Sequence, residues 1–201
     1  MTVGLFLDDF GRSQLRTTKD VDCIVPTLVS RPSWFALEET LRSRGWHPDV
    51  DGPVCRYRSP RGHLVDFLAV HPDIQGFAGR WFAAALASAS AHVVGGKELW
   101  VPDAAHLLAC KLEAYEDRGA ADPLLSKDLE DIVALVDGCG VLLETVARAP
   151  LPVCDYVRER VAVLLVNEEA MEAVAGHLPR GGDSGARLRK VQHRLAGLAR
   201  G

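Results

Sequence analysis

The sequence predicts an α+β fold in which a mixed sheet with flanking helices precedes a helical C-terminal half. Short apolar runs with a period of two, which are typical of strands, are confined to the first 101 residues. From Pro102 onward the apolar residues recur at helical spacing. Strands that come first and helices that follow are typical of α+β proteins. We therefore place an α+β core in residues 1–101 and a helical region in residues 102–201.

Composition and charge narrow the class of protein. The chain has 201 residues, 48% of them hydrophobic and 25% charged, so it can bury a core and is not a disordered or fibrous chain. No apolar run approaches the roughly 18–20 residues that span a bilayer. The N-terminus carries Asp8 and Asp9 without an early basic residue, unlike a signal peptide. The five scattered cysteines form no C-x-x-C pair, which favours free thiols and a cytoplasmic protein.

The first elements are predicted from periodicity and from residues that begin or end helices. We expect a short helix over residues 2–10 that ends at Gly11. Residues 20–26 alternate between two faces, which predicts a strand. Residues 32–44 predict a helix, because Pro32 suits a first turn and a glycine follows the last turn.

A hairpin, a helix and a second hairpin are expected next. Residues 54–58 and 63–70 read as two strands that turn at 59–62. A helix is expected over 79–90. Two short strands, 92–94 and 98–101, flank a Gly-Gly pair that we interpret as a hairpin turn.

The second half is predicted to be helical throughout. Asp103 can cap a helix that runs to about Arg118. Further helices are expected over residues 124–136, 141–147, 152–174 and 186–199. A glycine-rich break at 181–185 precedes the last helix.

The last helix combines an apolar seam with a basic surface. Its seam is formed by Leu188, Val191, Leu195 and Leu198. The segment 180–201 holds six basic residues and one acidic residue, a local charge of +5, whereas the net charge of the chain is −4. We expect the seam to pack on its own domain; the alternative is that the basic face contacts a partner or RNA.

Three aspartates on two predicted strands are the candidate catalytic residues. Asp20 and Asp22 lie at i and i+2, so both carboxylates project from one strand face. Asp66 interrupts an otherwise apolar strand, where a lone carboxylate is costly unless it is paired or binds a metal. Three such carboxylates can hold two divalent ions for in-line phosphoryl transfer. The alternative is a structural ion pair between Asp66 and Arg56 or Arg58.

Two sequence blocks resemble a known family. Gly11, Arg16, Thr17 or Thr18, Asp20 and Asp22 resemble the G-x-x-R-[ST]-x-D-x-D pattern of the nucleotidyltransferase superfamily, the polymerase-beta-like fold, with a longer Gly-to-Arg spacing. The segments 111–118 and 127–135 resemble the K-x-x-A-x-x-x-R and K-D-x-x-D-[IL]-x-x-L signatures of AbiEii-type nucleotidyltransferases. These are toxin components of bacterial toxin–antitoxin and phage-defence systems. The blocks cover roughly residues 3–26 and 60–137.

The resemblance implies a metal-dependent enzyme that moves a nucleotidyl group from an NTP to an acceptor hydroxyl. Asp20, Asp22 and Asp66 would hold Mg²⁺ or Mn²⁺, and Asp66 would also serve as a base toward the acceptor. Arg16 and Thr18 would contribute to nucleotide binding. The acceptor in toxin relatives includes RNA such as tRNA, and a cognate antitoxin protein is an expected partner.

The spacing of the charged residues in the second block also suits phosphate binding. Lys111 and Arg118 lie on one helix face, seven residues apart, and both can reach a polyphosphate. Asp128 on the next helix is expected to orient Lys111 or Arg118. We predict that the helical region completes the nucleotide site, with Lys111 in the same cleft as Asp20 and Asp22. The alternative is a surface helix hairpin with ordinary ion pairs.

The start of the chain departs from the family pattern. Family members carry a small-residue loop before the first helix, whose amides cradle phosphates. This chain begins Met1-Thr2-Val3-Gly4-Leu5, so we expect that Met1 is the internal methionine of such a motif or that Gly4 replaces the loop. Without that loop, the alternative function is a catalytically silent nucleotide- or partner-binding module. A third hypothesis is a small-molecule modifier of the aminoglycoside nucleotidyltransferase kind.

Overall fold

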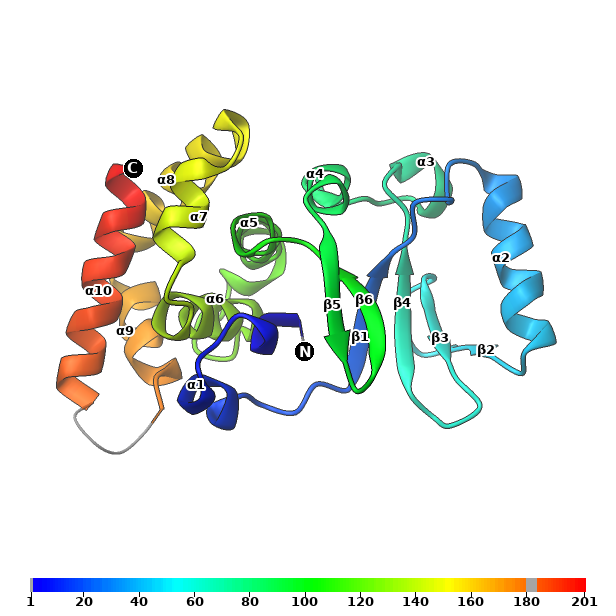
Figure 1. Cartoon of the computed structure of the whole chain (residues 1–201), viewed down its shortest axis with the longest axis horizontal. Helices are drawn as coiled ribbons and strands as arrows, with labels where there is room; N and C mark the ends of the chain where they lie inside the picture. Colours follow the sequence, from blue (N-terminus) through cyan, green and yellow to red (C-terminus); the bar gives the residue numbers. More distant parts are fainter. Residues whose placement is uncertain (1, 180–183) are drawn as a thin grey trace. The chain divides into compact units, whose positions relative to one another are not determined.

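The computed structural model describes residues 2–179 and 184–201 and confirms the predicted α+β fold (Figure 1). A mixed four-stranded sheet and a separate two-stranded hairpin lie in the N-terminal part, and the C-terminal half is helical. The chain divides into two compact units. The first is Arg16–Leu86, and the second combines Thr2–Leu15 with the described part of Ala87–Gly201. The predicted division of the chain into residues 1–101 and 102–201 stays a prediction.

The first unit is built on the four-stranded sheet. Its elements are β1 (Asp20–Ile24), α2 (Arg31–Ser43), β2 (His47–Pro48), β3 (Arg56–Arg58), β4 (Leu64–Leu68), α3 (Pro72–Gln75) and most of α4 (Phe82–Ala87). The strand order is β1-β4-β3-β2, with β1 parallel to β4 and the other pairs antiparallel. The first predicted strand, the helix after it and the hairpin are therefore confirmed. The short elements β2 and α3 are not predicted, because they contain too few residues to show a period.

One face of this sheet packs against α2. Ser30 begins the helix with a capping box, and Pro32 lies in its first turn. Trp34 of α2 meets Tyr57 of β3 edge to face, with ring centroids 6.1 Å apart. Because side chains alternate along a strand, this packing directs Asp66 and its neighbours in register to the other face.

The second unit contains the remaining elements. They are η1 (Thr2–Leu5), α1 (Asp9–Gln14), β5 (Ser90–Val94), β6 (Lys97–Val101), α5 (Ala104–Ala114), the π-helix η2 (Tyr115–Gly119), α6 (Lys127–Gly138), α7 (Leu142–Arg148), α8 (Leu151–Val166), α9 (Glu168–His177) and α10 (Ser184–Arg200). The hairpin β5–β6 turns at Gly95 and Gly96, both with positive φ, which confirms the predicted turn. The helix predicted over 79–90 is shorter, because Ser90 already pairs in β5.

The predicted N-terminal helix is wrong in its bounds. A 3-10 turn covers Thr2–Leu5, and a separate helix, α1, begins after Asp8. The Asp8 carboxylate accepts a hydrogen bond from the Gly11 amide at 2.7 Å and so caps α1 at its start. Gly11 therefore lies inside a helix and does not end one.

Helices α5, α6, α8 and α10 pack together to form the core of the second unit (Figure 1). Its fully buried side chains include Leu108, Leu129, Ile132, Leu135, Val157, Val161, Val191 and Leu195. The seam predicted for the last helix is confirmed, because α10 packs through it against α8 and α6. No helix within residues 2–179 and 184–201 is long and apolar enough to cross a membrane.

Three basic side chains of α10 bind the C-terminal end of α6. Lys190 donates to the Asp137 carboxylate at 3.0 Å, and Arg187 lies 3.4 Å from the same carboxylate. Arg194 donates to the Val136 and Asp137 carbonyls at 2.7 and 2.9 Å. Cations at a helix C-terminus are stabilising because the carbonyl ends carry partial negative charge. Much of the predicted basic face is thus engaged within its own unit.

Two expectations fall on residues outside the described ranges. The first concerns Met1. The second is the predicted glycine-rich break, most of which lies within residues 180–183. The last two residues of that break, Ser184 and Gly185, belong to α10.

All five cysteines are free, as expected. Burial raises the pKa of Cys55 to about 11 and that of Cys110 to about 12, so these thiols stay protonated at neutral pH.

The helix predicted over 152–174 is two helices. Helix α8 ends at Val166 and α9 begins at Glu168, with Asn167 between them. The Asn167 side chain accepts a hydrogen bond from the Ala170 amide at 3.0 Å. This local capping bond overrides an apolar spacing that continues through the break.

We predict that Asn167→Ala lowers the free energy of unfolding by about 0.5–2 kcal/mol, because the first turn of α9 loses its cap. Asn167→Asp keeps the acceptor and should be close to wild type. Urea denaturation followed by circular dichroism measures both variants. Equal midpoints for wild type and Asn167→Ala would show that the cap contributes nothing to stability.

Candidate functional site

The sheet register brings the three predicted aspartates of the first unit to one face. Parallel pairing of β1 with β4 aligns Asp22 with Asp66, and Asp20 lies two residues earlier on the same face. Antiparallel pairing of β3 with β4 sets Arg56 opposite Asp66. Four charged side chains therefore share this surface, which we call the carboxylate face: Asp20, Asp22, Asp66 and Arg56.

Arg56 connects two of these carboxylates. Its Nε donates to Asp66 Oδ1 at 2.7 Å, and its Nη2 donates to Asp66 Oδ2 and to Asp20 Oδ2, each at 2.8 Å. The two acceptor oxygens of Nη2 are therefore no further apart than twice that distance. Of the two arginines considered for an ion pair with Asp66, the structure selects Arg56. Arg58 pairs instead with Asp49 at 2.9 Å.

Burial makes this ion pair important for the sheet. The Asp66 side chain is only 9% exposed, whereas that of Asp20 is 40% exposed. A bidentate guanidinium forms charge-assisted hydrogen bonds with a buried carboxylate, and these are roughly twice as strong as hydrogen bonds between neutral groups. The hydrogen bond with Asp66 also raises the pKa of Arg56, so its charge is permanent. The pair fixes β3 and β4 at the position where β1 presents Asp22.

The carboxylate face contains the type of oxygen donors that a divalent ion needs. Carboxylate oxygens are the donors that Mg²⁺ prefers. However, three oxygens of Asp20 and Asp66 already accept hydrogen bonds from Arg56. Within the described ranges, no group of three or more His, Cys, Asp or Glu side chains is arranged to hold a metal ion. In this arrangement the residues do not fit a metal site, and metal binding by the three aspartates stays a prediction.

The other predicted residues of the first unit lie just before β1. Arg16 and Thr18 are half-buried in the irregular segment that leads into this strand. Their chain positions keep them near the start of β1, four and two residues before Asp20. Their part in nucleotide binding stays a prediction.

A second charged cluster lies in the second unit, and we call it the lysine cluster: Lys111, Arg118, Asp128 and Asp131. Lys111 Nζ lies 3.3 Å from Asp128 Oδ1 and 2.6 Å from Asp131 Oδ2. The predicted hydrogen bond between Lys111 and Asp128 is therefore present. Asp131 is the closer partner of Lys111, a role that sequence reasoning missed although its i, i+3 spacing from Asp128 places both on one helix face.

Arg118 completes the cluster from the π-helix. Its Nε and Nη2 donate to the two Asp128 oxygens at 2.8 and 3.2 Å. The Arg118 side chain is 71% exposed, whereas that of Lys111 is 19% exposed. Lys111 is consequently a fixed charge, and Arg118 reaches solvent.

The pKa of Asp128 shows how the cluster is balanced. Burial by itself would raise this pKa, because it disfavours the charged form. Hydrogen bonds from Arg118 and the charge of Lys111 outweigh burial, and the net effect is a lowered pKa. Asp128 is thus held as a carboxylate that orients two cations.

The turn that carries Arg118 depends on a glycine. A Cβ on Gly119 would lie 2.2 Å from Ser126 Oγ and 2.8 Å from Tyr115 Cδ2. Ser126 begins α6 by accepting a hydrogen bond from the Leu129 amide at 3.2 Å. The wide π-helix turn therefore packs directly against the start of α6. Such π-helical turns are rare and occur frequently at functional sites.

The glycine expected to replace a phosphate loop has a packing role. Gly4 is buried in η1, and a Cβ there would lie 2.8 Å from Leu15 Cδ1. A backbone that is covered in this way is not a cradle for phosphate. The carboxylate face and the lysine cluster belong to different units, so the expectation that they share one cleft also stays a prediction.

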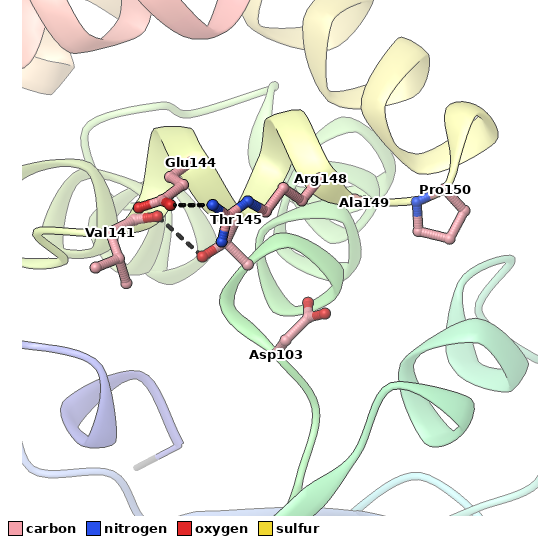
Figure 2. A pocket seen from close by; sticks show the side chains of 7 residues that line it. All are labelled: Asp103, Val141, Glu144, Thr145, Arg148, Ala149 and Pro150. Atoms are coloured by element: carbon pink, nitrogen blue, oxygen red, sulfur yellow. Dashed lines mark hydrogen bonds and ion pairs between the residues drawn. The ribbon is translucent and has the colours of Figure 1, made fainter.

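A pocket of about 370 Å³ lies elsewhere in the second unit, beside α7 and the start of α5 (Figure 2). Its charged side chains already bind partners nearby. Glu144 pairs with Arg148 at 2.7 Å, and Asp103 accepts hydrogen bonds from the backbone and ring of His106. None of the residues predicted to bind nucleotide or metal lines this pocket.

Comparisons of the chain with protein-family models, with curated proteins and with solved structures gave no match.

We predict that Asp128→Asn lowers the free energy of unfolding by about 1–3 kcal/mol at pH 7, because it leaves a buried cation with one partner fewer. The pKa of Asp128 is lowered in the folded state, so its contribution is present above the unfolded value, about 3.9, and is lost as the pH falls through the folded value.

Thermal unfolding between pH 3 and pH 8 measures this dependence. The difference in Tm between wild type and Asp128→Asn should be full at pH 7 and should shrink below about pH 4. Asp117→Asn removes an exposed carboxylate from the same region and serves as the control. A difference that is constant from pH 8 to pH 3 would contradict the assignment.

Proposed function

We propose that this chain is a nucleotidyltransferase that moves a nucleotidyl group from an NTP to an acceptor hydroxyl and depends on Mg²⁺ or Mn²⁺. The observation that supports the proposal best is the alignment of Asp22 with Asp66 on adjacent parallel strands, with Asp20 on the same face. Like charges placed this close repel one another, so a sheet that presents all three is suited to cations. The sequence that carries these aspartates is also the one that resembles the superfamily.

The lysine cluster supports the part of the proposal that concerns binding of the NTP triphosphate. An NTP brings about four negative charges, and a lysine on a rigid helix offers a point charge to a terminal phosphate. Asp128 and Asp131 hold Lys111 at hydrogen-bond distance, so little side-chain entropy would be lost when phosphate binds. Exposed Arg118 would add a second positive charge.

Within this proposal, Asp20 and Asp22 would hold the metal, whose charge would neutralise the phosphates. Asp66 has both oxygens bound by Arg56 in the described arrangement. Its service as a metal ligand or as a base therefore requires Arg56 to leave. The resemblance to AbiEii-type toxins extends the proposal to an RNA acceptor such as tRNA and to a cognate antitoxin.

A second function is favoured by one observation. Arg56 provides the cation that the carboxylate face needs, so this face is stable without metal. That arrangement suits a catalytically silent module that binds a nucleotide or a partner protein. The two functions differ in whether an NTP is consumed.

We predict that Lys111→Ala weakens NTP binding by about 10- to 100-fold in the presence of Mg²⁺, because a charged hydrogen bond to phosphate is lost. Lys111→Arg should not restore full affinity, since a planar fork replaces a point charge. Isothermal titration calorimetry measures all variants, with exposed Lys97→Ala as the control. Equal affinity for wild type and Lys111→Ala would contradict the phosphate-binding role.

We further predict that Asp22→Asn abolishes transfer from a radiolabelled NTP to an RNA acceptor while NTP binding and Tm stay close to wild type. Asp22 is exposed on its strand, so its replacement should leave the sheet intact. Asp51→Asn, which changes another exposed acid of the first unit, should transfer normally. An NTP that binds wild type without being consumed, across RNA, protein and aminoglycoside acceptors, would favour the silent module.

A further inference from the structure

The hairpin β5–β6 of the second unit is a sheet of only two strands, so each strand has one outer edge (Figure 1). Within the described ranges, no backbone hydrogen bond joins residues 97–100 to an element other than β5. A two-stranded hairpin by itself is at best marginally stable in water, and further strands stabilise it. The outer edge of β6 is therefore open to another strand.

The register of the hairpin decides which backbone groups point outward from β6. Val94 and Lys97 flank the two-residue turn, where facing residues exchange hydrogen bonds. This exchange recurs at every second residue of an antiparallel pair, so it recurs at Leu99. Glu98 and Trp100 consequently direct their N–H and C=O groups outward. A strand added to this edge would pair with the backbone of these two residues.

The same two residues also present their side chains on one face of the hairpin. Glu98 and Trp100 lie two positions apart on a strand, so their side chains project together. The Trp100 residue is 68% exposed, and Val93, which pairs with Glu98, is 78% exposed. On the other face of the hairpin, Val101 is buried. One face thus packs on its own unit, and the face with Glu98 and Trp100 is open to a partner.

The charge on the open face defines the chemistry of the partner. Glu98 is exposed and has no ion pair within the part of the chain that the structure describes, and Lys97 lies on the opposite face. Cross-strand pairs of opposite charge, and pairs of an aromatic with a β-branched residue, stabilise a sheet. A basic residue opposite Glu98 and an apolar one opposite Trp100 therefore fit this edge. The net charge of −4 also attracts a basic segment.

A second copy of the chain fits the edge less well. Two β6 strands that pair antiparallel about Leu99 would set Glu98 of each opposite Trp100 of the other. Pairing about Glu98 would place two like charges opposite each other, which is destabilising. Pairing about Trp100 would set Glu98 opposite Pro102, which has no N–H to donate. None of these registers gives Glu98 a cation.

We propose that the outer edge of β6 binds an extended segment of another protein, which adds a third strand to the hairpin. This segment has a basic residue opposite Glu98 and an apolar residue opposite Trp100. Main-chain hydrogen bonds supply affinity in this mode of recognition, and the alternate side chains supply specificity. The inference does not rest on nucleotidyl transfer, because the hairpin contains none of the residues assigned to nucleotide or metal binding.

The first test uses a fluorescein-labelled peptide that repeats Arg-Thr-Val-Thr, so that arginine and valine share one face. Fluorescence anisotropy with the full chain should show saturable binding, and a peptide with glutamate in place of arginine should bind about fivefold or more weakly. Glu98→Lys should reverse this preference. Lys97→Gln, altered on the opposite face of the same strand, is the control and should keep it. No binding by wild type, or equal affinity for both peptides, would overturn the proposal.

The second test probes the backbone pairing in wild type, so it does not depend on the folding of a variant. Residues opposite Glu98 and Trp100 direct their N–H groups toward β6. N-methyl groups on the arginine and valine amides should therefore weaken binding about tenfold or more. N-methyl groups on the threonine amides, which point away from β6, should have a much smaller effect. Equal affinities for the two methylated peptides would contradict strand addition.

Amide hydrogen exchange identifies the edge that is used. The arginine peptide should protect the amides of Glu98 and Trp100 from exchange. Protection of Ala91 and Val93 instead would show binding at the outer edge of β5 and would overturn the choice of β6. If the Glu98 and Trp100 amides are protected without peptide and light scattering shows a dimer, a second copy occupies the edge and the proposal is wrong.

Discussion

The structure depends on pairing each buried carboxylate with a cation. The buried aspartates within the described residues are Asp66, Asp128, Asp131 and Asp137. An unpaired carboxylate in such surroundings costs several kcal/mol, so each needs a basic partner before its element can pack. Arg56 serves Asp66, Lys111 serves both aspartates of the lysine cluster, and Lys190 serves Asp137. These pairs are therefore part of the tertiary structure.

Each pair joins elements that lie apart in the sequence. Arg56 connects β3 with β4 and β1, the lysine cluster connects α5 and the π-helix with α6, and the α10 cations connect the last helix with α6. The first two sets include the residues with which the family resemblance is concerned. The charges that stabilise each unit thus also position its candidate functional groups, and a change in one affects stability and function together.

The two proposed functions differ in what they require of the Arg56 side chain. With Arg56 in place, the carboxylate face is neutralised by the protein itself and needs no metal. With Arg56 displaced, the same oxygens form a set of hard donors on adjacent strands. The lysine cluster is compatible with either proposed function, because the phosphate-binding role proposed for Lys111 does not require the nucleotide to react. The two proposals therefore differ in the arrangement of the carboxylate face.

Periodicity in the sequence predicted most of the longer elements and the positions of the charged residues on them. The period-two pattern placed Asp20 and Asp22 on one strand face, and the helical spacing from Asp128 to Asp131 placed both on one side of α6. Helix capping was not predicted from periodicity. The side chains of Asp8 and Asn167 begin new helices within segments whose apolar spacing looks continuous.

Which charged side chains form ion pairs depends on tertiary packing. Arg56 and Arg58 are equivalent partners for Asp66 in the sequence, and the register of β3 on β4 selects between them. Asp131 became the closest partner of Lys111 through the packing of α5 on α6. Periodicity fixes the direction of a side chain on its own element, whereas an ion pair depends on the distance between two elements, which only packing sets.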